Sequence, residues 1–373
     1  MNRDGTASLK WDRYKGRDII PLWVADMDFR SPPAVIEALK ARADHGVFGY
    51  TTPPDELVET IIEMLARDYS WSVEPEWLVW LPGLVTGLNV MCRSLEGDAQ
   101  EVLSAVPVYP PFLSAPGLAR KKLTTTPLVE QDGRYVFDFD HLAGAITKNT
   151  GLFLLCNPHN PVGRVFTREE LVRLGQICEQ EDVIICSDEI HCDLVLDTDK
   201  NHIPMATLGE DIARRTVTLM APSKTYNIPG LGCSFAIIPE RKLRKSFLRA
   251  MEGIVPHINT FGYTAALAAY RDGKTWHEEL LDYLRTNRDI VSRWVWDMDG
   301  LCMNHVEATY LAWIDMRQTG LPDPVRCLED AGVGMSDGAH FSSPGFARLN
   351  FGCPRSTLRE ALERMQAALK HDV

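Results

Sequence analysis

The sequence predicts an α/β fold, with a mostly parallel sheet in a large domain followed by a smaller α+β domain. From Trp77 onward, short apolar runs alternate with helical stretches, which is typical of βαβ units and of a sheet covered on both faces. A long amphipathic stretch over 276–298 then leads to two further apolar runs, as expected of a helix that connects two domains. A length of 373 residues suits one large domain and one small one.

The predicted strands of the large domain are short apolar runs bounded by turn residues. They cover 78–81, 101–106, 151–156, 183–187, 216–220 and 233–238. Among the helices between them, one opens with a capping box formed by Thr167 and Glu170. In sheets of this kind, ligands bind beyond the carboxyl ends of the strands, so the residues after each run are candidates for chemistry.

The domain boundaries follow from the same pattern. Residues 46–275 are predicted to form the large domain, which binds the cofactor described below. The segment 1–45 is too short to fold alone, and we expect it to complete a small domain with residues 276–373. Helices are expected over 33–44 and 55–69, and further strands over 310–316 and 347–352. The sequence contains no internal repeat and no low-complexity linker.

Composition narrows the function classes. A hydrophobic fraction of 45% with 24% charged residues is typical of a globular enzyme. The net charge is -12 and no Lys/Arg cluster occurs, so nucleic acids and anionic membranes are not expected as partners. The nine scattered cysteines lack Cys-x-x-Cys spacing, so we predict reduced thiols and no metal site. Without an apolar run of the ~18 residues that span a bilayer, and without a signal-like N-terminus, we expect a cytoplasmic protein.

Lys224 is the first candidate for catalysis. It falls between two apolar runs, so we expect it on a short loop between two buried strands. Apolar surroundings disfavour the ammonium form of lysine, and the neutral amine is a nucleophile that can form a Schiff base. For an isolated Ser-Lys pair, an ordinary solvated lysine is the alternative.

Turns after the first two runs suit a phosphorylated aromatic ligand. Gly83, Leu84 and Val85 open a helix, whose backbone N–H groups and dipole hold a phosphate well, although such turns are common. After the second run, prolines flank Tyr109, whose ring suits stacking on a heteroaromatic cofactor or ordinary packing in a core.

Polar residues follow the next runs. Asn160, in the turn-rich segment 157–164, is able to donate to a phenolate oxygen or to serve as a plain turn residue. Asp188 comes at the end of a buried run, where a carboxylate is costly unless paired; a protonated pyridine nitrogen and a structural salt bridge are both suitable partners. Ser223 and Lys224 follow the fifth run.

Taken together, these groups describe one ligand, pyridoxal 5'-phosphate. They provide a phosphate turn, a stacking ring, a phenolate donor, a carboxylate for a ring nitrogen and a nucleophilic amine. Farther along the chain, Arg348 lies within a predicted strand, where its guanidinium could bind a substrate α-carboxylate or form a surface ion pair. We therefore expect an enzyme that acts on a small amino acid.

The chain resembles the fold-type I pyridoxal-phosphate enzymes of the class I/II aminotransferase superfamily, and within them the MalY/PatB-type cystathionine β-lyases. The resemblance covers nearly the whole chain, including Lys10-Trp11-Asp12, the segments 23–29, 157–164, 223–231 and 348–352, and Asp188-Glu189-Ile190-His191. It implies a PLP-dependent transferase-like fold with a mostly parallel seven-stranded sheet, and a homodimer that shares its active sites. The implied reaction is β-elimination on cystathionine or other S-substituted L-cysteines, which gives pyruvate, ammonia and a thiol.

The resemblance also assigns a role to each matching position. Lys224 is the implied catalytic residue, which binds the cofactor and removes the substrate Cα proton. The implied cofactor-binding residues are Gly83, Leu84, Val85, Ser223 and the partner subunit's Tyr50 at the phosphate, Tyr109 on the ring, Asn160 at the phenolate oxygen, Asp188 at the ring nitrogen, and His191. The implied substrate-binding residues are Ala25, Asn160 and Arg348, with Arg348 at the carboxylate.

Some positions depart from the family patterns. His191 stands where aminotransferases carry a tyrosine, and Gly232 stands where they carry a phosphate-binding arginine. Both departures favour the lyase subgroup. Tyr226 and Thr86 replace residues common in that subgroup, so the substrate preference could differ.

Two alternatives stay open on the sequence alone. One is an aminotransferase of the same superfamily, which would pass the amino group to a 2-oxo acid. The other is a pyridoxal-phosphate-binding regulatory protein that acts through protein contacts, although no basic face supports direct contact with DNA.

Overall fold

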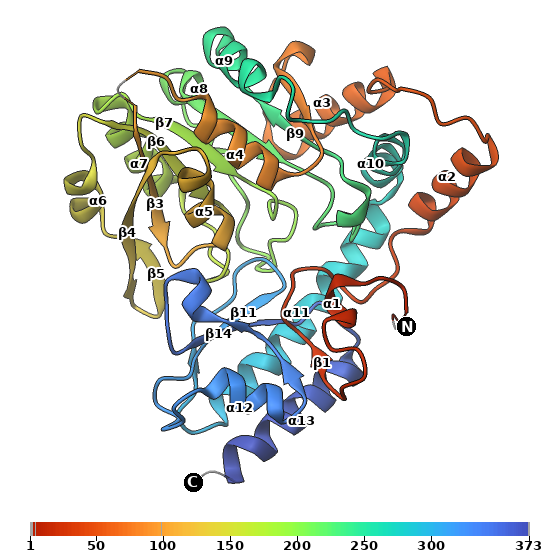
Figure 1. Cartoon of the computed structure of the whole chain (residues 1–373), viewed down its shortest axis with the longest axis vertical. Helices are drawn as coiled ribbons and strands as arrows, with labels where there is room; N and C mark the ends of the chain where they lie inside the picture. The colour runs from red at the N-terminus through yellow and green to blue at the C-terminus, as the bar shows by residue number, and fades with distance from the viewer. Residues whose placement is uncertain (1–2, 4, 98, 372–373) are drawn as a thin grey trace.

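The computed structural model describes residues 3, 5–97 and 99–371, which form a large α/β part and a smaller α+β part (Figure 1). The large part contains an eight-stranded sheet in the order β2-β9-β8-β7-β6-β3-β4-β5. Its strands are β2 (Leu78–Leu81), β3 (Glu101–Val106), β4 (Lys122–Gln131), β5 (Arg134–Phe137), β6 (Thr150–Cys156), β7 (Ile184–Asp188), β8 (Thr216–Met220) and β9 (Ser234–Ile237). Strands β8, β7, β6, β3 and β4 pair in parallel, while β2, β9 and β5 run antiparallel to their neighbours. The mostly parallel sheet is confirmed.

The sheet has eight strands, one more than the seven that the family resemblance implies. The six apolar runs of the sequence all correspond to strands, and the two strands that the pattern does not reveal are the hairpin of β4 and β5. Across this hairpin, Leu128 pairs with Phe137. Its turn contains Asp132 and Gly133, whose φ angles of 52° and 71° are favoured by Asp-Gly pairs. Most of β4 is exposed or half-buried, so it lacks the continuous apolar run that marks the other strands.

Helices cover both faces of the sheet, as the alternation of side chains along β6 shows. Leu152 and Leu154 pack into one apolar cluster, while Phe153 and Leu155 pack into the cluster on the opposite face. The first face is covered by α4 (Leu84–Ser94), α5 (Pro110–Leu118) and α9 (Arg241–Met251), and the second by α6 (Phe139–Ala145), α7 (Arg168–Gln180) and α8 (Glu210–Arg214).

Helix α7 begins as the sequence predicts. The Thr167 hydroxyl accepts from the Glu170 N–H at 3.2 Å, and the Glu170 carboxylate accepts from the Thr167 N–H at 2.8 Å, so the capping box is confirmed. Helices α3 (Asp55–Tyr69) and α10 (Thr260–Asp272) pack against the β2–β9 end of the sheet. Short 3₁₀ turns occur at Pro75–Trp77, Met205–Thr207, Pro229–Leu231 and Gly338–Phe341.

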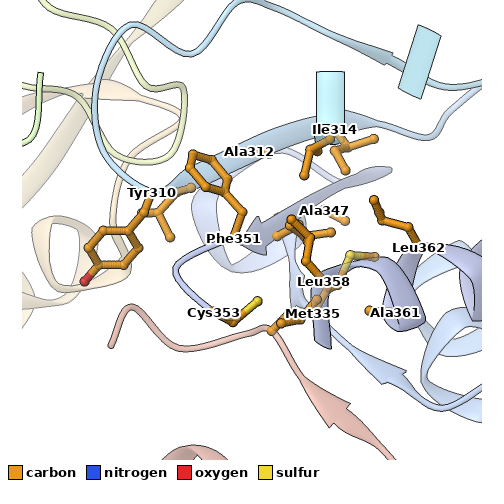
Figure 2. Close-up of a cluster of buried hydrophobic side chains, with 14 of the residues drawn as sticks. Tyr310, Ala312, Ile314, Met335, Ala347, Phe351, Cys353, Leu358, Ala361 and Leu362 are labelled. Carbon is orange, nitrogen blue, oxygen red and sulfur yellow. The ribbon is translucent and has the colours of Figure 1, made fainter. Parts of the chain in front are cut away.

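The small part is built around a four-stranded antiparallel sheet and two long helices. Its elements are β10 (Cys302–Met303), β11 (Leu311–Asp315), β13 (Ser336–Asp337), β14 (Phe346–Asn350), α11 (Lys274–Trp296), α12 (Pro324–Asp330) and α13 (Arg355–His371). Figure 2 shows its core, in which Ile314, Ala347, Phe351 and Leu358 meet between the sheet and the helices. No helix within the described ranges is both long and apolar enough to cross a bilayer.

The N-terminal segment contributes to this small part. It contains α1 (Leu9–Asp12) and β1 (Ile20–Pro21), and β1 pairs in parallel with β12 (Val333–Gly334). The side chains of Leu22 and Met27 are buried in the same core.

Helix α2 (Pro33–Asp44) lies elsewhere, against α10 of the large part. Its Val35 packs with Ala265 and Ala268. The boundaries at 46 and 275 remain a proposal, and this packing favours placing α2 with the large domain.

Candidate active site

A cavity of about 850 Å³ opens at the carboxyl ends of the central strands, where the small part covers them. The predicted site residues that line it are Ala25, Gly83, Leu84, Val85, Tyr109, Asn160, Asp188, His191, Ser223, Lys224 and Arg348. Tyr50 is not among the lining residues, and its side chain is fully exposed. The fold therefore brings together residues that are up to 323 positions apart in the sequence, from Ala25 to Arg348.

Lys224 lies on the loop after β8, as predicted. Its Nζ donates to the carbonyl oxygen of Ala25 at 2.5 Å and faces the cavity. Burial and the positive charge of Arg348 lower the pKa of Lys224 to about 8, against the opposing effects of Asp26 and Asp188. A larger share of this amine is neutral near neutral pH than in a solvated lysine, so it is suited to act as a nucleophile or a base.

Asp188 is the last residue of β7, and its side chain is buried in the cavity wall. Its carboxylate accepts from the N–H of Ile190 at 3.2 Å and forms no ion pair with any described residue. Burial raises the pKa of Asp188 to about 7, although the Ile190 N–H and the charge of Lys224 act in the opposite direction. A structural salt bridge, the alternative considered above, is thus absent from the described residues, and the carboxyl suits a cationic N–H of a ligand.

Arg348 reaches the cavity from β14 and is buried, so it is not a surface ion-pair residue. One terminal nitrogen donates to the side-chain oxygen of Asn160 at 3.0 Å, and the other donates to the carbonyl oxygen of Trp23 at 2.8 Å. Its Nε has no hydrogen-bond partner among the described residues. Burial lowers the pKa of Arg348 to about 10, so the guanidinium remains charged at neutral pH and suits a carboxylate.

The start of α4 forms the end of the cavity where an anion would be held. Gly83 caps this 11-residue helix, and Leu84 and Val85 are its first residues. Ser223 lines the same cavity. Gly232 has a φ of 59°, and a Cβ there would lie 3.2 Å from the carbonyl oxygen of Pro82, so an arginine at this position would be strained.

His191 and Tyr109 provide rings on the cavity wall. His191 is buried, and its Nδ1 has no partner among the described residues. Burial and the charges of Lys224 and Arg348 lower the pKa of His191 to about 3, so the imidazole is neutral at physiological pH. Tyr109 precedes α5, its backbone N–H donates to the Asn160 carbonyl at 3.1 Å, and burial raises the pKa of its phenol.

The residues present fit pyridoxal phosphate. The unpaired Asp188 carboxyl suits a protonated ring nitrogen, the start of α4 suits a phosphate, and Lys224 offers an amine to the aldehyde. The charged guanidinium of Arg348 lines the same cavity and suits a substrate carboxylate.

Several lining residues are not predicted from the sequence. Met335, Ser336 and Phe341 come from β13 and the short elements beside it, which lack a recognisable apolar period. Trp23 and Tyr310 support the site through backbone carbonyl groups near Ala25. The Trp23 carbonyl accepts from Arg348, and the Tyr310 hydroxyl donates to the Ala25 carbonyl at 2.9 Å. The only signal for them is that Trp23 lies in a family segment and Tyr310 begins a predicted strand.

Comparison with known proteins supports this assignment. The family described as aminotransferase class I and II matches residues 17–365. Cystathionine β-lyase PatB of Bacillus subtilis is 39% identical over 379 residues, covering 98% of this chain and 98% of that protein.

Two solved structures are similar over nearly their whole length. The crystal structure of OvoB has a TM-score of 0.97 and 46% identity, covering 99% of this chain and 97% of that one. Cystalysin from Treponema denticola, which contains pyridoxal 5'-phosphate, has a TM-score of 0.95 and 32% identity, covering 100% of this chain and 98% of that one.

The state of Asp188 predicts a pH-dependent effect of Asp188→Asn on the stability of the cofactor-free protein. Below pH ~4 the carboxyl is protonated in both the folded and unfolded states, so the variant should match the wild type. Between pH ~4 and ~7 the unfolded chain releases this proton while the folded chain retains it, so the wild type loses stability relative to the variant. Above pH ~7 the variant should be more stable by about 2–4 kcal/mol.

Chemical denaturation of both proteins at pH 4, 6 and 8 measures this difference. A difference that does not change with pH would contradict the burial of an unpaired carboxyl at Asp188.

Proposed function

The chain belongs to the aminotransferase class I and II family, and we propose that within this family it is a pyridoxal 5'-phosphate-dependent C–S β-lyase. Its substrate is cystathionine or another S-substituted L-cysteine, and its products are pyruvate, ammonia and a thiol. The similarity to enzymes named as cystathionine β-lyases supports the reaction class.

The observation that carries this proposal is the placement of three groups around one cavity. The three groups that line it are the Lys224 amine, the Arg348 guanidinium and the Asp188 carboxyl, and this carboxyl forms no ion pair with a described residue. Burial shifts the pKa of each group, and none of the three forms an ion pair with a described residue, as a purely structural role would require.

The chain's residues divide into those that hold the cofactor and those that hold the substrate. We assign the phosphate to the N–H groups of Gly83, Leu84 and Val85 and to the Ser223 hydroxyl, the ring to Tyr109 and Asp188, and the phenolate oxygen to Asn160 with His191 beside it. When bound, pyridoxal phosphate supplies an electron sink that stabilises negative charge at the substrate Cα, so that the β-sulfur can leave.

Lys224 and Arg348 act on the substrate. The guanidinium of Arg348 binds the α-carboxylate, and its bonds to Asn160 and Trp23 fix its orientation. The Nζ of Lys224, with its lowered pKa, accepts the Cα proton. Asp188 keeps its carboxyl at the ring nitrogen. The small part covers the cavity and keeps bulk water away from these steps.

A homodimer is part of the proposal, because Tyr50 does not line the cavity of its own chain. The segment between α2 and α3 exposes the apolar side chains of Val47 and Phe48 together with Tyr50. We propose that a second copy covers this segment and that Tyr50 reaches the phosphate of the partner's site.

The buried cysteines suit a reducing compartment, and we propose the cytosol.

Replacing Lys224 with alanine tests the reaction directly. Wild-type protein supplied with pyridoxal phosphate should release pyruvate from L-cystathionine, and Lys224→Ala should lower this rate by at least about 1,000-fold because it removes both the cofactor anchor and the base. A coupled assay for pyruvate measures both proteins, with the surface variant Lys15→Ala as the control.

Adding a 2-oxo acid separates the two enzyme classes. A new amino acid formed without pyruvate would assign the chain to the aminotransferases. Binding of pyridoxal phosphate with neither product would favour the regulatory alternative.

Mixed dimers test the proposed role of Tyr50. Co-expression of Lys224→Ala and Tyr50→Ala chains should give heterodimers in which one site carries both changes and the other carries none. Their activity should therefore rise to about half that of the wild type, well above either parent, because a lost hydrogen bond to phosphate costs ~1.5–3 kcal/mol. If Tyr50 acts within its own chain or not at all at the phosphate, mixing will not restore an intact site, and activity will not exceed the weighted mean of the parents.

A further inference from the structure

Two segments beside the cavity are hydrogen-bonded to each other, and the proposed mechanism assigns no role to their side chains. One is α1, which contains Lys10, and the other is the irregular backbone over 23–28, which we name the strap. The indole N–H of Trp23, in the strap, donates to the carbonyl oxygen of Lys10, in α1, at 3.1 Å. This hydrogen bond connects the two segments.

Lys10 is an unusual residue in this junction because its side chain is entirely buried. Its Nζ lies 2.7 Å from a carboxylate oxygen of Asp28 and donates to the carbonyl oxygen of Asp26 at 3.2 Å. The other oxygen of Asp28 accepts from the Trp11 indole at 2.9 Å and from Arg3 at 2.8 Å. An ammonium and a carboxylate buried in this way are costly unless both are well paired, and here both are.

The strap in turn holds the two reactive cations of the cavity. Its Ala25 carbonyl accepts from Lys224 at 2.5 Å, and its Trp23 carbonyl accepts from Arg348 at 2.8 Å. Asp26 and Asp28, which Lys10 contacts, are therefore one to five residues away from Trp23 and Ala25, whose carbonyl groups contact the proposed substrate-binding and catalytic side chains.

Neutral side chains hold the strap from two other sides. Asn350 of β14 donates to the carbonyls of Val24 at 2.6 Å and Asp26 at 2.7 Å. Asn227 exchanges hydrogen bonds with the backbone of Met27, accepting at 2.9 Å and donating at 2.9 Å. The strap should thus remain attached when Lys10 is changed, so the effect of Lys10 on its position can be measured separately from folding.

We propose that Lys10 is a positioning residue for the C–S lyase reaction: its buried pair with Asp28 sets the strap so that the Ala25 and Trp23 carbonyls orient Lys224 and Arg348. This inference rests on the proposed function. Lys10 itself does not line the cavity.

A charged pair suits this task better than packing alone. Charge-assisted hydrogen bonds are shorter and stronger than neutral ones, and the Lys10 ammonium contacts the strap at two residues at once, through the backbone carbonyl of Asp26 and the side-chain carboxylate of Asp28. A misplacement of about 1 Å in a group that orients a substrate can cost ~100-fold in rate.

The test uses the double variant Lys10→Met/Asp28→Asn beside Lys10→Met alone. The single change leaves a buried carboxylate short of one partner and can lower stability, whereas the double change removes the buried pair, an exchange that often costs little stability. Lys15→Met, which changes an exposed lysine of the same N-terminal segment, is the matched control. All proteins are studied as holoenzymes.

The expected result is a folded double variant whose KM for L-cystathionine rises about tenfold or more, with a lower kcat, because Arg348 and Lys224 lose their fixed orientation. Hydrogen exchange should be faster in the peptide over 22–29 and unchanged in the peptide over 216–220. The control should match the wild type in both measurements.

A purely stabilising role gives a different result. In that case the double variant keeps the wild-type KM and the wild-type rate of hydrogen exchange in the peptide over 22–29, and kcat falls only in proportion to the folded fraction. This result would overturn the proposal. If the wild type releases no pyruvate from any S-substituted cysteine, the proposed function is wrong. The role of Lys10 is tested separately: unchanged hydrogen exchange over 22–29 in the double variant would refute it.

Discussion

The active cavity depends on a buried carboxyl group, that of Asp188, which no described residue pairs with a positive charge. A carboxylate at the end of a central strand loses its hydration, and burial raises its pKa to about 7. The same cavity is also lined by Lys224 and Arg348, whose pKa values burial lowers. The chain therefore places charged groups without ion-pair partners among the described residues around a cavity of about 850 Å³. A ligand with a cationic ring nitrogen and anionic groups would supply the opposite charges.

The sheet topology explains why these groups meet. The parallel strands β3, β6, β7 and β8 all end at one edge, so the residues that follow them lie together although the sequence separates them. The small part then contributes Arg348 from β14, and the strap over 23–28 lies between the two parts. In this arrangement the N-terminal segment is more than a covering element, because its backbone carbonyls contact the side chains of Lys224 and Arg348.

Much of this arrangement is predictable from the sequence, and the limits have physical reasons. Strands with continuous apolar runs, such as β3 and β8, occur at the predicted residues, since burial on both faces requires such runs. The β4–β5 hairpin lacks that signal because β4 is largely exposed. Asp188 and Lys224 are predictable as strand-end residues, whereas the support of Lys224 by the Ala25 carbonyl is a backbone contact that no residue type encodes. Likewise, Tyr50 cannot be placed at a phosphate from one chain, since its side chain is fully exposed there.

Reductive trapping tests the central claim most directly. The holoprotein is reduced with borohydride, digested, and its peptides are analysed by mass spectrometry for covalently attached pyridoxal phosphate. We expect the added mass on Lys224 alone, since its amine lines the cavity with a pKa lowered to about 8. Attachment at another lysine, or no attachment after incubation with excess cofactor, would contradict the account.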